Sequence, residues 1–359
     1  MPTTFGRELC SNVLYIVMYM FIIIILVGFI FCVSVLIHCE LFDNSLPKAD
    51  EFALTNEDSS EPIDVVYTWV NSKDPEWIEL KQKALETITD IGHIDNTRAR
   101  WVNTNEPHEE ISLSIESVRT YLPWVRNIFV VTQRPQQLPE HITSKFNVRY
   151  VHHDQIIHSH LLPVFSSHAI EANIHRIPDL SEKFIYFNDD MYINRPMKIS
   201  DFFYGAKRPI FRYYKYYSFY LNYISRIINS NEQHCNSMIH CRHLFEQKTK
   251  PYLLPCIHQA TPITKEIMSD AEEMVKKDWE RTISNKFRSL GDIVPVYISI
   301  ALAYHNKKAI MLKNDPIKHT LLSSYIHASF FHNNSHLICV NHLNKSSMNL
   351  LRKQILSSK

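Results

Sequence analysis

Glycine is scarce in this chain, which has only 5 glycines among 359 residues. None of them forms a G-x-G-x-x-G or G-x-x-x-x-G-K-[ST] pattern, so the Gly-rich phosphate loops of dinucleotide-binding and P-loop proteins are excluded. A phosphate group must therefore be held by a metal ion, by Arg or by helix N-termini.

The chain also has no large excess of positive charge, because it contains 38 Lys and Arg residues and 37 Asp and Glu residues, which gives a net charge of +1. Nucleic-acid binding requires a basic field, so DNA and RNA are not expected partners. The 7 cysteines contain no C-x-x-C pair, which disfavours a structural zinc site built from thiolates. Hydrophobic residues make up 45% of the chain, enough for a large core.

A long apolar run is present near the start, where Val13 to Ile37 contains no charged residue. It is longer than the roughly 20 residues that cross a bilayer, whereas the apolar stretch of a signal peptide has about 7–15 residues. We therefore predict a cytosolic tail (1–12), a transmembrane helix (13–37) and a polar stalk (38–62). Residues 63–359 then form a luminal domain in the Golgi or a related secretory compartment, with sequons at Asn333 and Asn344.

Within residues 63–359, β-branched and aromatic runs alternate with helical patterns. The expected strands are residues 63–70, 127–132, 147–151 and 183–187. The expected helices are residues 76–89, 109–121, 166–176, 265–287 and 292–304. This alternation predicts an α/β fold with a mostly parallel sheet covered by helices. Ligands are then expected at the carboxyl ends of the strands.

Two adjacent carboxylates, Asp189 and Asp190, follow the strand 183–187. Carboxylates are the ligands that Mg²⁺ or Mn²⁺ accepts, and a cation neutralises the charge of a diphosphate. Nucleotide-sugar transferases often hold their metal in this way. Asn and Asp are also favoured in a turn that follows a strand, so the pair by itself is also consistent with a purely structural role in such a turn.

Four blocks of this sequence resemble the signature blocks of the Stealth family, in that family's order. Their most telling parts are I-D-V-V-Y-T-W-V-N-S-K-D-P from Ile63, L-L-P-V-F-S-S-H-A-I-E from Leu161 to Glu171, F-N-D-D from Phe187, P-C-I-H-Q-A-T-P from Pro255, and L-I-C-V-N from Leu337. The blocks lie near residues 63–75, 109–196, 251–305 and 330–345. The chain departs from the family pattern at Ala260 and at His342 after Asn341.

The Stealth family includes bacterial capsule sugar-phosphate transferases and the catalytic subunit of a lysosomal-enzyme N-acetylglucosamine-1-phosphotransferase. The resemblance implies a nucleotide-sugar-transferase-like sheet and transfer of a sugar 1-phosphate from a UDP-sugar, foremost UDP-N-acetylglucosamine, to a glycan hydroxyl, with release of UMP. It further implies Mg²⁺ or Mn²⁺ as cofactor. A UDP-sugar, a glycan, the lipid bilayer at the N-terminal helix and a second copy of the chain are the expected partners.

The resemblance also assigns roles to individual residues. Asp190 would bind the cation or act at the phosphorus, with Asp189 beside it and Glu171 as a further carboxylate. His258 would accept the proton of the attacking hydroxyl, and Arg288 would hold phosphate oxygens. The predicted substrate-binding residues are Asp64, Trp69, Asn71, Asp74 and Asn188.

Other interpretations stay open at this point. Glu171 is spaced to pair with His175 one helical turn later, and His168 shares that face, although the absence of H-E-x-x-H disfavours zinc there. A metal-dependent glycosyltransferase that releases UDP is one rival function, and an inactive membrane lectin or scaffold is another. The nucleotide product distinguishes the first rival, and loss of metal-dependent donor binding distinguishes the second.

Overall fold

The structure is a computed structural model of the chain. It describes residues 17–31, 33–34, 37, 61–88, 108–134, 138–205, 208–212, 233–248, 258–312, 319–323, 335–341 and 345–357. The predicted tail (1–12), nearly all of the predicted stalk (38–62), both sequon asparagines and the start of the third Stealth-like block lie outside these residues.

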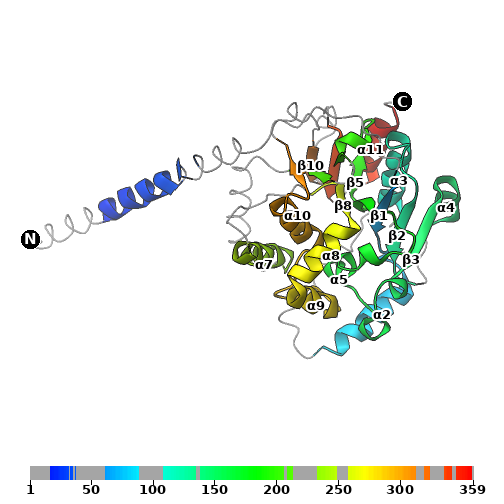
Figure 1. Cartoon of the computed structure of the whole chain (residues 1–359), viewed down its shortest axis with the longest axis horizontal. Helices are drawn as coiled ribbons and strands as arrows, with labels where there is room; N and C mark the ends of the chain where they lie inside the picture. Colours follow the sequence, from blue (N-terminus) through cyan, green and yellow to red (C-terminus); the bar gives the residue numbers. More distant parts are fainter. Residues whose placement is uncertain are drawn as a thin grey trace, which may run out of the picture.

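The predicted transmembrane helix over residues 13–37 is wrong. Among the residues that the structure describes, no helix has both the length and the apolar character that a bilayer crossing requires. The described helical residues of this region are 17–31, 33–34 and 37 (blue in Figure 1). The lipid bilayer is therefore not supported as a partner.

A five-stranded sheet forms the centre of the fold, in the order β3-β2-β1-β4-β8 (Figure 1). Four of its strands are parallel, and β8 pairs antiparallel with β4. The strands are β1 (Ile63–Thr68), β2 (Ile128–Thr132), β3 (Val148–His152), β4 (Lys183–Asn188) and β8 (Thr261–Thr264). The predicted mostly parallel sheet and its four strands are confirmed.

Side chains of this sheet alternate between two apolar layers, because successive residues of a strand point to opposite faces. Val66 of β1 and Phe184 of β4 pack in one layer with residues of α5, α7, α8, α9 and α10. Val65 and Ile185 pack in the other layer with residues of α3, α4 and α11. Helices therefore cover both faces of the sheet.

The helices of the described part are α2 (Pro75–Glu86), α3 (Glu109–Tyr121), α4 (Glu140–Phe146), α5 (Ser167–Glu171), α7 (Gln233–Lys248), α8 (Lys265–Met274), α9 (Lys276–Ser284), α10 (Pro295–His305) and α11 (Lys345–Ser357). Short 3₁₀ turns are η2 (His153–Gln155), η3 (Ser159–Leu161), η4 (Ile174–Arg176) and η5 (Ile199–Asp201).

Two predicted helices are interrupted. The helix expected over residues 265–287 divides into α8 and α9 at Val275, whose backbone leaves the helical region (φ −119°, ψ 34°) and whose side chain is buried in the core. The helix expected over residues 166–176 becomes α5 followed by η4. Burial of the Val275 side chain thus overrides the helical spacing between α8 and α9.

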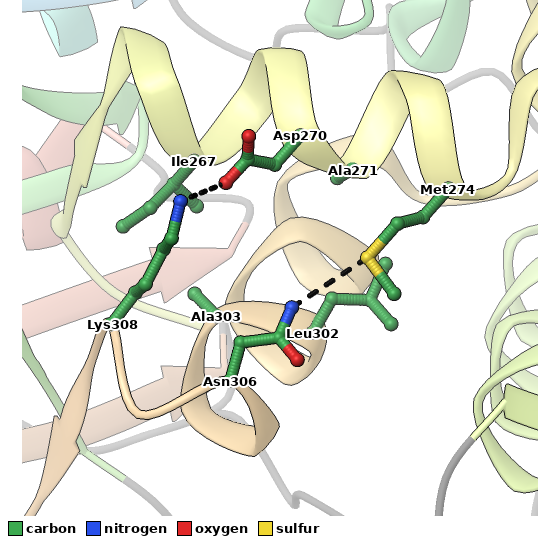
Figure 2. A pocket seen from close by; sticks show the side chains of 8 residues that line it. All are labelled: Ile267, Asp270, Ala271, Met274, Leu302, Ala303, Asn306 and Lys308. Atoms are coloured by element: carbon green, nitrogen blue, oxygen red, sulfur yellow. Dashed lines mark hydrogen bonds and ion pairs between the residues drawn. The ribbon is translucent and has the colours of Figure 1, made fainter.

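Helix α8 packs against α10, and Figure 2 shows the small hollow between them. Lys308 forms an ion pair with Asp270, and Asn306 Nδ2 lies 3.6 Å from the sulfur of Met274. Apolar side chains of both helices line the rest of the hollow. This part of the protein has the character of a packed core rather than of a ligand site.

Two smaller sheets flank the central one. The order β10-β11-β5 joins β10 (His319–Ser323), β11 (Leu337–Asn341) and β5 (Met191–Ile193), and the order β6-β7-β9 joins β6 (Phe203–Tyr204), β7 (Arg208–Phe211) and β9 (Ile310–Met311). Strand β5 begins directly after Asp190, and β11 pairs with it antiparallel. A segment distant in sequence is thereby brought beside the acidic pair.

Candidate active site

The order of the central strands places a switch point between β1 and β4. From β1 the chain moves to β2 and β3 on one side, and it returns to β4 on the other side. Ligands of open α/β sheets bind at such a point, outside the carboxyl ends of the strands. The last residues of the two strands, Thr68 and Asn188, are paired in register. Asp189 and Asp190 directly follow, so the acidic pair lies at the position where a ligand is expected.

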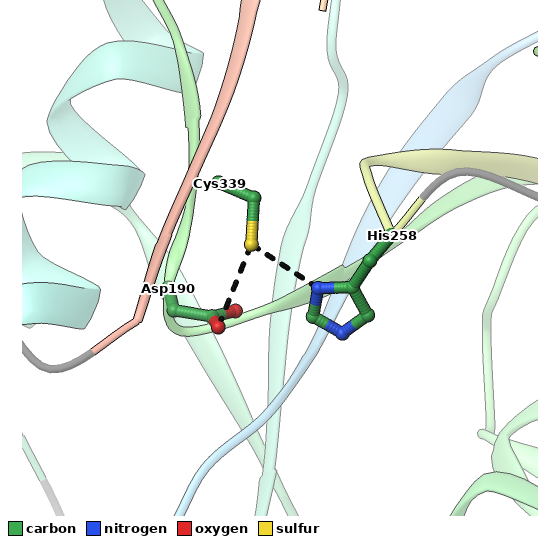
Figure 3. Close-up of side chains that lie close together, drawn as sticks. All are labelled: Asp190, His258 and Cys339. Atoms are coloured by element: carbon green, nitrogen blue, oxygen red, sulfur yellow. Dashed lines mark hydrogen bonds between the residues drawn. The ribbon is translucent and has the colours of Figure 1, made fainter. Parts of the chain in front are cut away.

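Three side chains from different segments meet there: Asp190, His258 and Cys339 (Figure 3). His258 Nδ1 lies 3.1 Å from the sulfur of Cys339, and that sulfur lies 3.6 Å from Asp190 Oδ2. Their candidate ligand atoms all lie within 4.8 Å of one another. These three residues can therefore hold a metal ion.

Strand pairing explains why these residues meet. Tyr186 pairs with Thr261 in the antiparallel β4–β8 ladder, and continuing this register brings His258 level with Asn188 and Asp189. Cys339 pairs with Met191 on β5, and the N–H of the next residue, Val340, donates to the carbonyl of Asp190 at 3.0 Å. Backbone hydrogen bonds thus fix Asp190 and Cys339, and His258 lies three residues before β8.

The second ring nitrogen of His258 continues a chain of hydrogen bonds into the protein. Tyr186 donates to Asn188 Oδ1 at 2.8 Å, so the amide Nδ2 of Asn188 faces His258 Nε2 at 2.9 Å. A donor at Nε2 leaves the proton of the neutral ring on Nδ1. His258 then donates to the sulfur of Cys339, and the Cys339 thiol donates to Asp190.

Glu171, on α5, lies at the other end of this series of hydrogen bonds. Burial raises the pKa of Glu171 to about 7, against the opposing effects of the charge of Arg288 and a hydrogen bond with Tyr186. Tyr186 also lies 2.9 Å from the hydroxyl of Thr68. The ionised Glu171 accepts a hydrogen bond from Tyr186, which lowers the pKa of Glu171, whereas the protonated Glu171 can donate to the Tyr186 hydroxyl, which then donates to Asn188.

Arg288 approaches Glu171 from the segment after α9. Its guanidinium donates to the hydroxyl of Ser167, with Nη2 at 2.7 Å and Nε at 3.2 Å, and the N–H of Phe165 donates to the carbonyl of Lys286 at 2.7 Å. The predicted residues Glu171, Asn188, Asp190, His258 and Arg288 are therefore connected through contacts or charge interactions.

Glu110 is a further acidic residue of the site, at the start of α3. It is 8% exposed, and burial raises its pKa to about 7, with the charges of Asp190 and Glu109 acting in the same direction. Burial raises the pKa of Tyr192 well above its usual value, and the charges of Glu110, Asp190 and Asp189 act in the same direction. Its hydroxyl is buried and has no hydrogen-bond partner among the described residues.

Asp64 does not join this group. It lies near the start of β1, four residues before Thr68, or about 13 Å at about 3.3 Å per residue. Its carboxylate accepts hydrogen bonds from Arg126 (Nε at 2.9 Å) and from the backbone N–H groups of Asn127 and Ser181. Burial acts to raise the pKa of Asp64, but these hydrogen bonds outweigh it and hold the pKa below its usual value.

The other predicted substrate-binding residues follow β1. Trp69 is 6% exposed within the core, and Asn71 accepts a hydrogen bond from the N–H of Lys73 through its side chain. The carboxylate of Asp74 accepts from the N–H of Trp77 at 2.9 Å and caps α2. These residues lie at the same edge of the sheet as Asn188, and Asp74 has a structural use there.

The alternative pairing of Glu171 with His175 is not found. His175 instead lies 3.1 Å from Glu272 of α8, and His168 lies 3.9 Å from Asp292. The helical face that would have joined His168, Glu171 and His175 ends with α5. No zinc site of that composition occurs in the described part of the chain.

The acidic pair fits a divalent cation. Asp190 Oδ1 is buried and accepts no hydrogen bond from any described residue, whereas a buried carboxylate oxygen ordinarily has a partner. Mg²⁺ and Mn²⁺ are commonly held by one or two carboxylates together with substrate phosphates. Asp189 and Asp190 can supply those carboxylates.

Sequence reasoning missed Glu110, Tyr186 and Cys339 as parts of the site. Glu110 lies at the start of α3 in the second Stealth-like block, and Cys339 lies in the last block. Their positions within these blocks could have identified both as candidate site residues. Tyr186 looks like an ordinary strand residue. Asn341 of the last block lies on β11, its side chain is outside the described residues, and His342 is outside them altogether.

Comparison with known protein families gives two matches in sequential order. Residues 61–89 match Stealth protein CR1, conserved region 1, and residues 104–210 match Stealth protein CR2, conserved region 2. The matches cover β1 with α2, and the stretch from α3 to β7 that contains Glu110, Glu171 and the acidic pair.

Curated relatives agree with these matches. A capsular polysaccharide phosphotransferase of Neisseria meningitidis serogroup B is 42% identical over 176 residues, which cover 45% of this chain and 46% of the relative. Capsular polysaccharide phosphotransferase fcs1 of Haemophilus influenzae is 34% identical over 241 residues, 65% of this chain and 62% of the relative. The chain thus spans about half to two thirds of the length of these relatives.

Solved structures give only weak likeness. Mouse xyloside xylosyltransferase 1 aligns with 10% identity and a TM-score of 0.37, over 80% of this chain and 99% of that protein. The galactosyltransferase LgtC aligns with 9% identity and a TM-score of 0.35, over 70% of this chain and 92% of that protein. Family membership rests instead on the conserved regions and the curated relatives: the chain belongs to the Stealth family.

Proposed function

We propose that this chain transfers a sugar 1-phosphate from a nucleotide sugar to a hydroxyl group of a glycan. UDP-N-acetylglucosamine is the proposed donor, and the products are a phosphodiester and UMP. Membership of a family with capsular polysaccharide phosphotransferases supports the reaction class. The observation that carries the proposal is the connection of Asp190, His258, Asn188 and Glu171 by hydrogen bonds at the switch point of the sheet.

The diphosphate of the donor would lie at the acidic pair. Asp189 and Asp190 would hold Mg²⁺ or Mn²⁺, which when bound would neutralise charge on the diphosphate. Asn188, Trp69 and Asn71 lie at the same edge and are the proposed contacts for the donor. Asp64 is not included, because all of its observed hydrogen bonds are made at the opposite end of β1.

His258 is the proposed general base. The acceptor oxygen forms a bond to the sugar-proximal phosphorus, the bond from that phosphorus to the bridging oxygen breaks, and UMP leaves. The acceptor's proton passes to Nε2 of His258, which is the nitrogen without a proton in the observed hydrogen-bond pattern. The incoming hydroxyl must displace the side-chain N–H group of Asn188, which donates a hydrogen bond to that nitrogen in the structure.

Arg288 and Glu171 are the proposed support for the transferred phosphoryl group. A planar guanidinium binds phosphate oxygens in pairs and so stabilises charge that develops during transfer. Ser167 and the charge of Glu171 orient that guanidinium. Glu171 would thus act through Arg288 and Tyr186 rather than on the substrate itself.

Nucleotide release tests this proposal. The full chain would be incubated with UDP-N-acetylglucosamine, Mg²⁺ or Mn²⁺ and a high-mannose glycan, with D190A and a chelator as controls. We expect UMP, and we expect it to disappear with either control. Release of UDP would instead indicate a glycosyltransferase, and no metal-dependent binding of any nucleotide sugar would indicate an inactive scaffold.

A location in the secretory lumen and a homodimeric state stay predictions of the sequence.

A further inference from the structure

We infer that Asp190, His258 and Cys339 form a binding site for Zn²⁺, distinct in its ligand set from a Mg²⁺ or Mn²⁺ site at the acidic pair. The separations fit such a site. Bond lengths of about 2.3 Å to sulfur and about 2.0–2.1 Å to nitrogen or oxygen place neighbouring ligand atoms of a tetrahedral zinc about 3.5 Å apart. The observed separations at the sulfur are 3.1 Å and 3.6 Å, and all three ligand atoms lie within 4.8 Å.

The chemistry of the ligands selects the metal. Thiolate and imidazole are soft or intermediate ligands that suit zinc, whereas Mg²⁺ requires oxygen ligands. Cys339 is fully buried and lies on a strand whose register with β5 fixes it beside Asp190. Three protein ligands leave a fourth position, which a water molecule or a phosphate oxygen can occupy.

The surroundings of His258 also suit a bound metal. A histidine that binds metal through Nδ1 carries its proton on Nε2, and that N–H needs an acceptor. Asn188 lies 2.9 Å from Nε2, and a rotation of its amide by half a turn would present Oδ1 to the N–H. Tyr186 would then accept from the amide nitrogen and donate to Glu171, so the hydrogen-bond chain stays complete.

Zinc at this site would prevent transfer. With Nδ1 bound to metal and Nε2 protonated, His258 has no nitrogen left to accept a proton, and Asp190 is no longer available for Mg²⁺ or Mn²⁺. Binding would also release the thiol proton of Cys339, because thiolate is the ligand. This consequence for catalysis rests on the proposed function, whereas zinc binding itself does not.

Co²⁺ is the probe for the test, because it occupies zinc sites and gives a thiolate-to-metal charge-transfer band in the ultraviolet. Co²⁺ would be titrated into the full chain under reducing conditions, without donor or acceptor, and Zn²⁺ would then be added to displace it. We expect one equivalent of Co²⁺ to produce the band and Zn²⁺ to abolish it. We expect equimolar Mg²⁺ to leave it unchanged, because Mg²⁺ does not favour thiolate or imidazole ligands.

Two cysteine variants separate this site from other thiols. C339S keeps the other cysteines and is nearly isosteric, and it should lose the band while its thermal unfolding stays close to that of the wild type. C241A is the matched control, since Cys241 is equally buried and burial raises its pKa to about 12. It should keep the band. N188A should weaken Zn²⁺ binding by roughly 10–100-fold, as loss of a supporting hydrogen bond does.

The inference is overturned if the wild type gives no charge-transfer band, or if C339S retains it. It is also overturned if equimolar Mg²⁺ displaces Co²⁺. Because donor and acceptor are absent from the titration, any of these results would leave the proposed transferase reaction standing.

Discussion

Replacing Glu110 with Gln should make the protein more stable at pH 8 than the wild type and change little at pH 5. Glu110 is 8% exposed, and burial raises its pKa from 4.5 to about 7. A raised pKa means that the folded state favours the protonated carboxyl. The cost to folding is therefore absent below about pH 4.5, grows as the pH rises towards 7, and stays constant above that.

The magnitude follows from the same pKa. Each pKa unit corresponds to about 1.4 kcal/mol, so a rise from 4.5 to about 7 costs about 3 kcal/mol at pH 8. At pH 5 only about 0.8 kcal/mol of this cost is present, because the folded carboxyl is still protonated. The free energy of unfolding of E110Q relative to wild type should thus increase by about 2.5 kcal/mol between the two pH values.

Denaturant unfolding in the presence of a chelator measures this difference, since a cation near Asp190 would change the charge around Glu110. E109Q is the matched control, because it removes the same charge one position earlier at a half-buried site. It should have a much smaller effect. A stability difference between E110Q and wild type that is the same at pH 5 and pH 8 would refute the raised pKa of Glu110.

Three further substitutions test the roles assigned to individual residues. H258Q should lower kcat by about 10²–10⁴-fold with little change in the KM of the donor, as expected for loss of a general base, and an unchanged kcat would remove His258 from that role. R288A should lower kcat by about 10³-fold, and R288K should recover only part of it because lysine lacks the planar fork; full recovery would argue against paired phosphate contacts. D64A should lower the free energy of unfolding by about 3 kcal/mol, since it leaves the buried N–H groups of Asn127 and Ser181 without their acceptor and removes the partner of the half-exposed Arg126, and a raised donor KM in the folded variant would place Asp64 in the nucleotide site.

The central part of the fold could be predicted from the sequence because its signals are local. Alternating strands and helices gave the mostly parallel sheet, and the position of Asp189 and Asp190 after a strand gave the edge at which the site lies. The same geometry argues against Asp64 as a nucleotide contact. A residue near the start of a parallel strand lies at the amino end, away from the edge where ligands bind.

The contacts that complete the site could not be predicted in this way. Cys339 reaches Asp190 only through the antiparallel pairing of β11 with β5, and Glu110 reaches it through the packing of α3 on β5. Both depend on tertiary contacts over a long sequence separation. The predicted transmembrane helix over residues 13–37 is wrong, because no helix of the described residues is both long and apolar enough to cross a bilayer.

The fate of the donor's sugar-proximal phosphate tests the proposed reaction most directly. UDP-N-acetylglucosamine carrying radioactive phosphorus in its β-phosphate would be incubated with the full chain, divalent cation and glycan, and the nucleotide and glycan fractions would be separated. Transfer of a sugar 1-phosphate predicts that the label appears in the glycan and that unlabelled UMP is released, with neither in D190A. Label that remains in UDP while the sugar enters the glycan would contradict the proposed reaction.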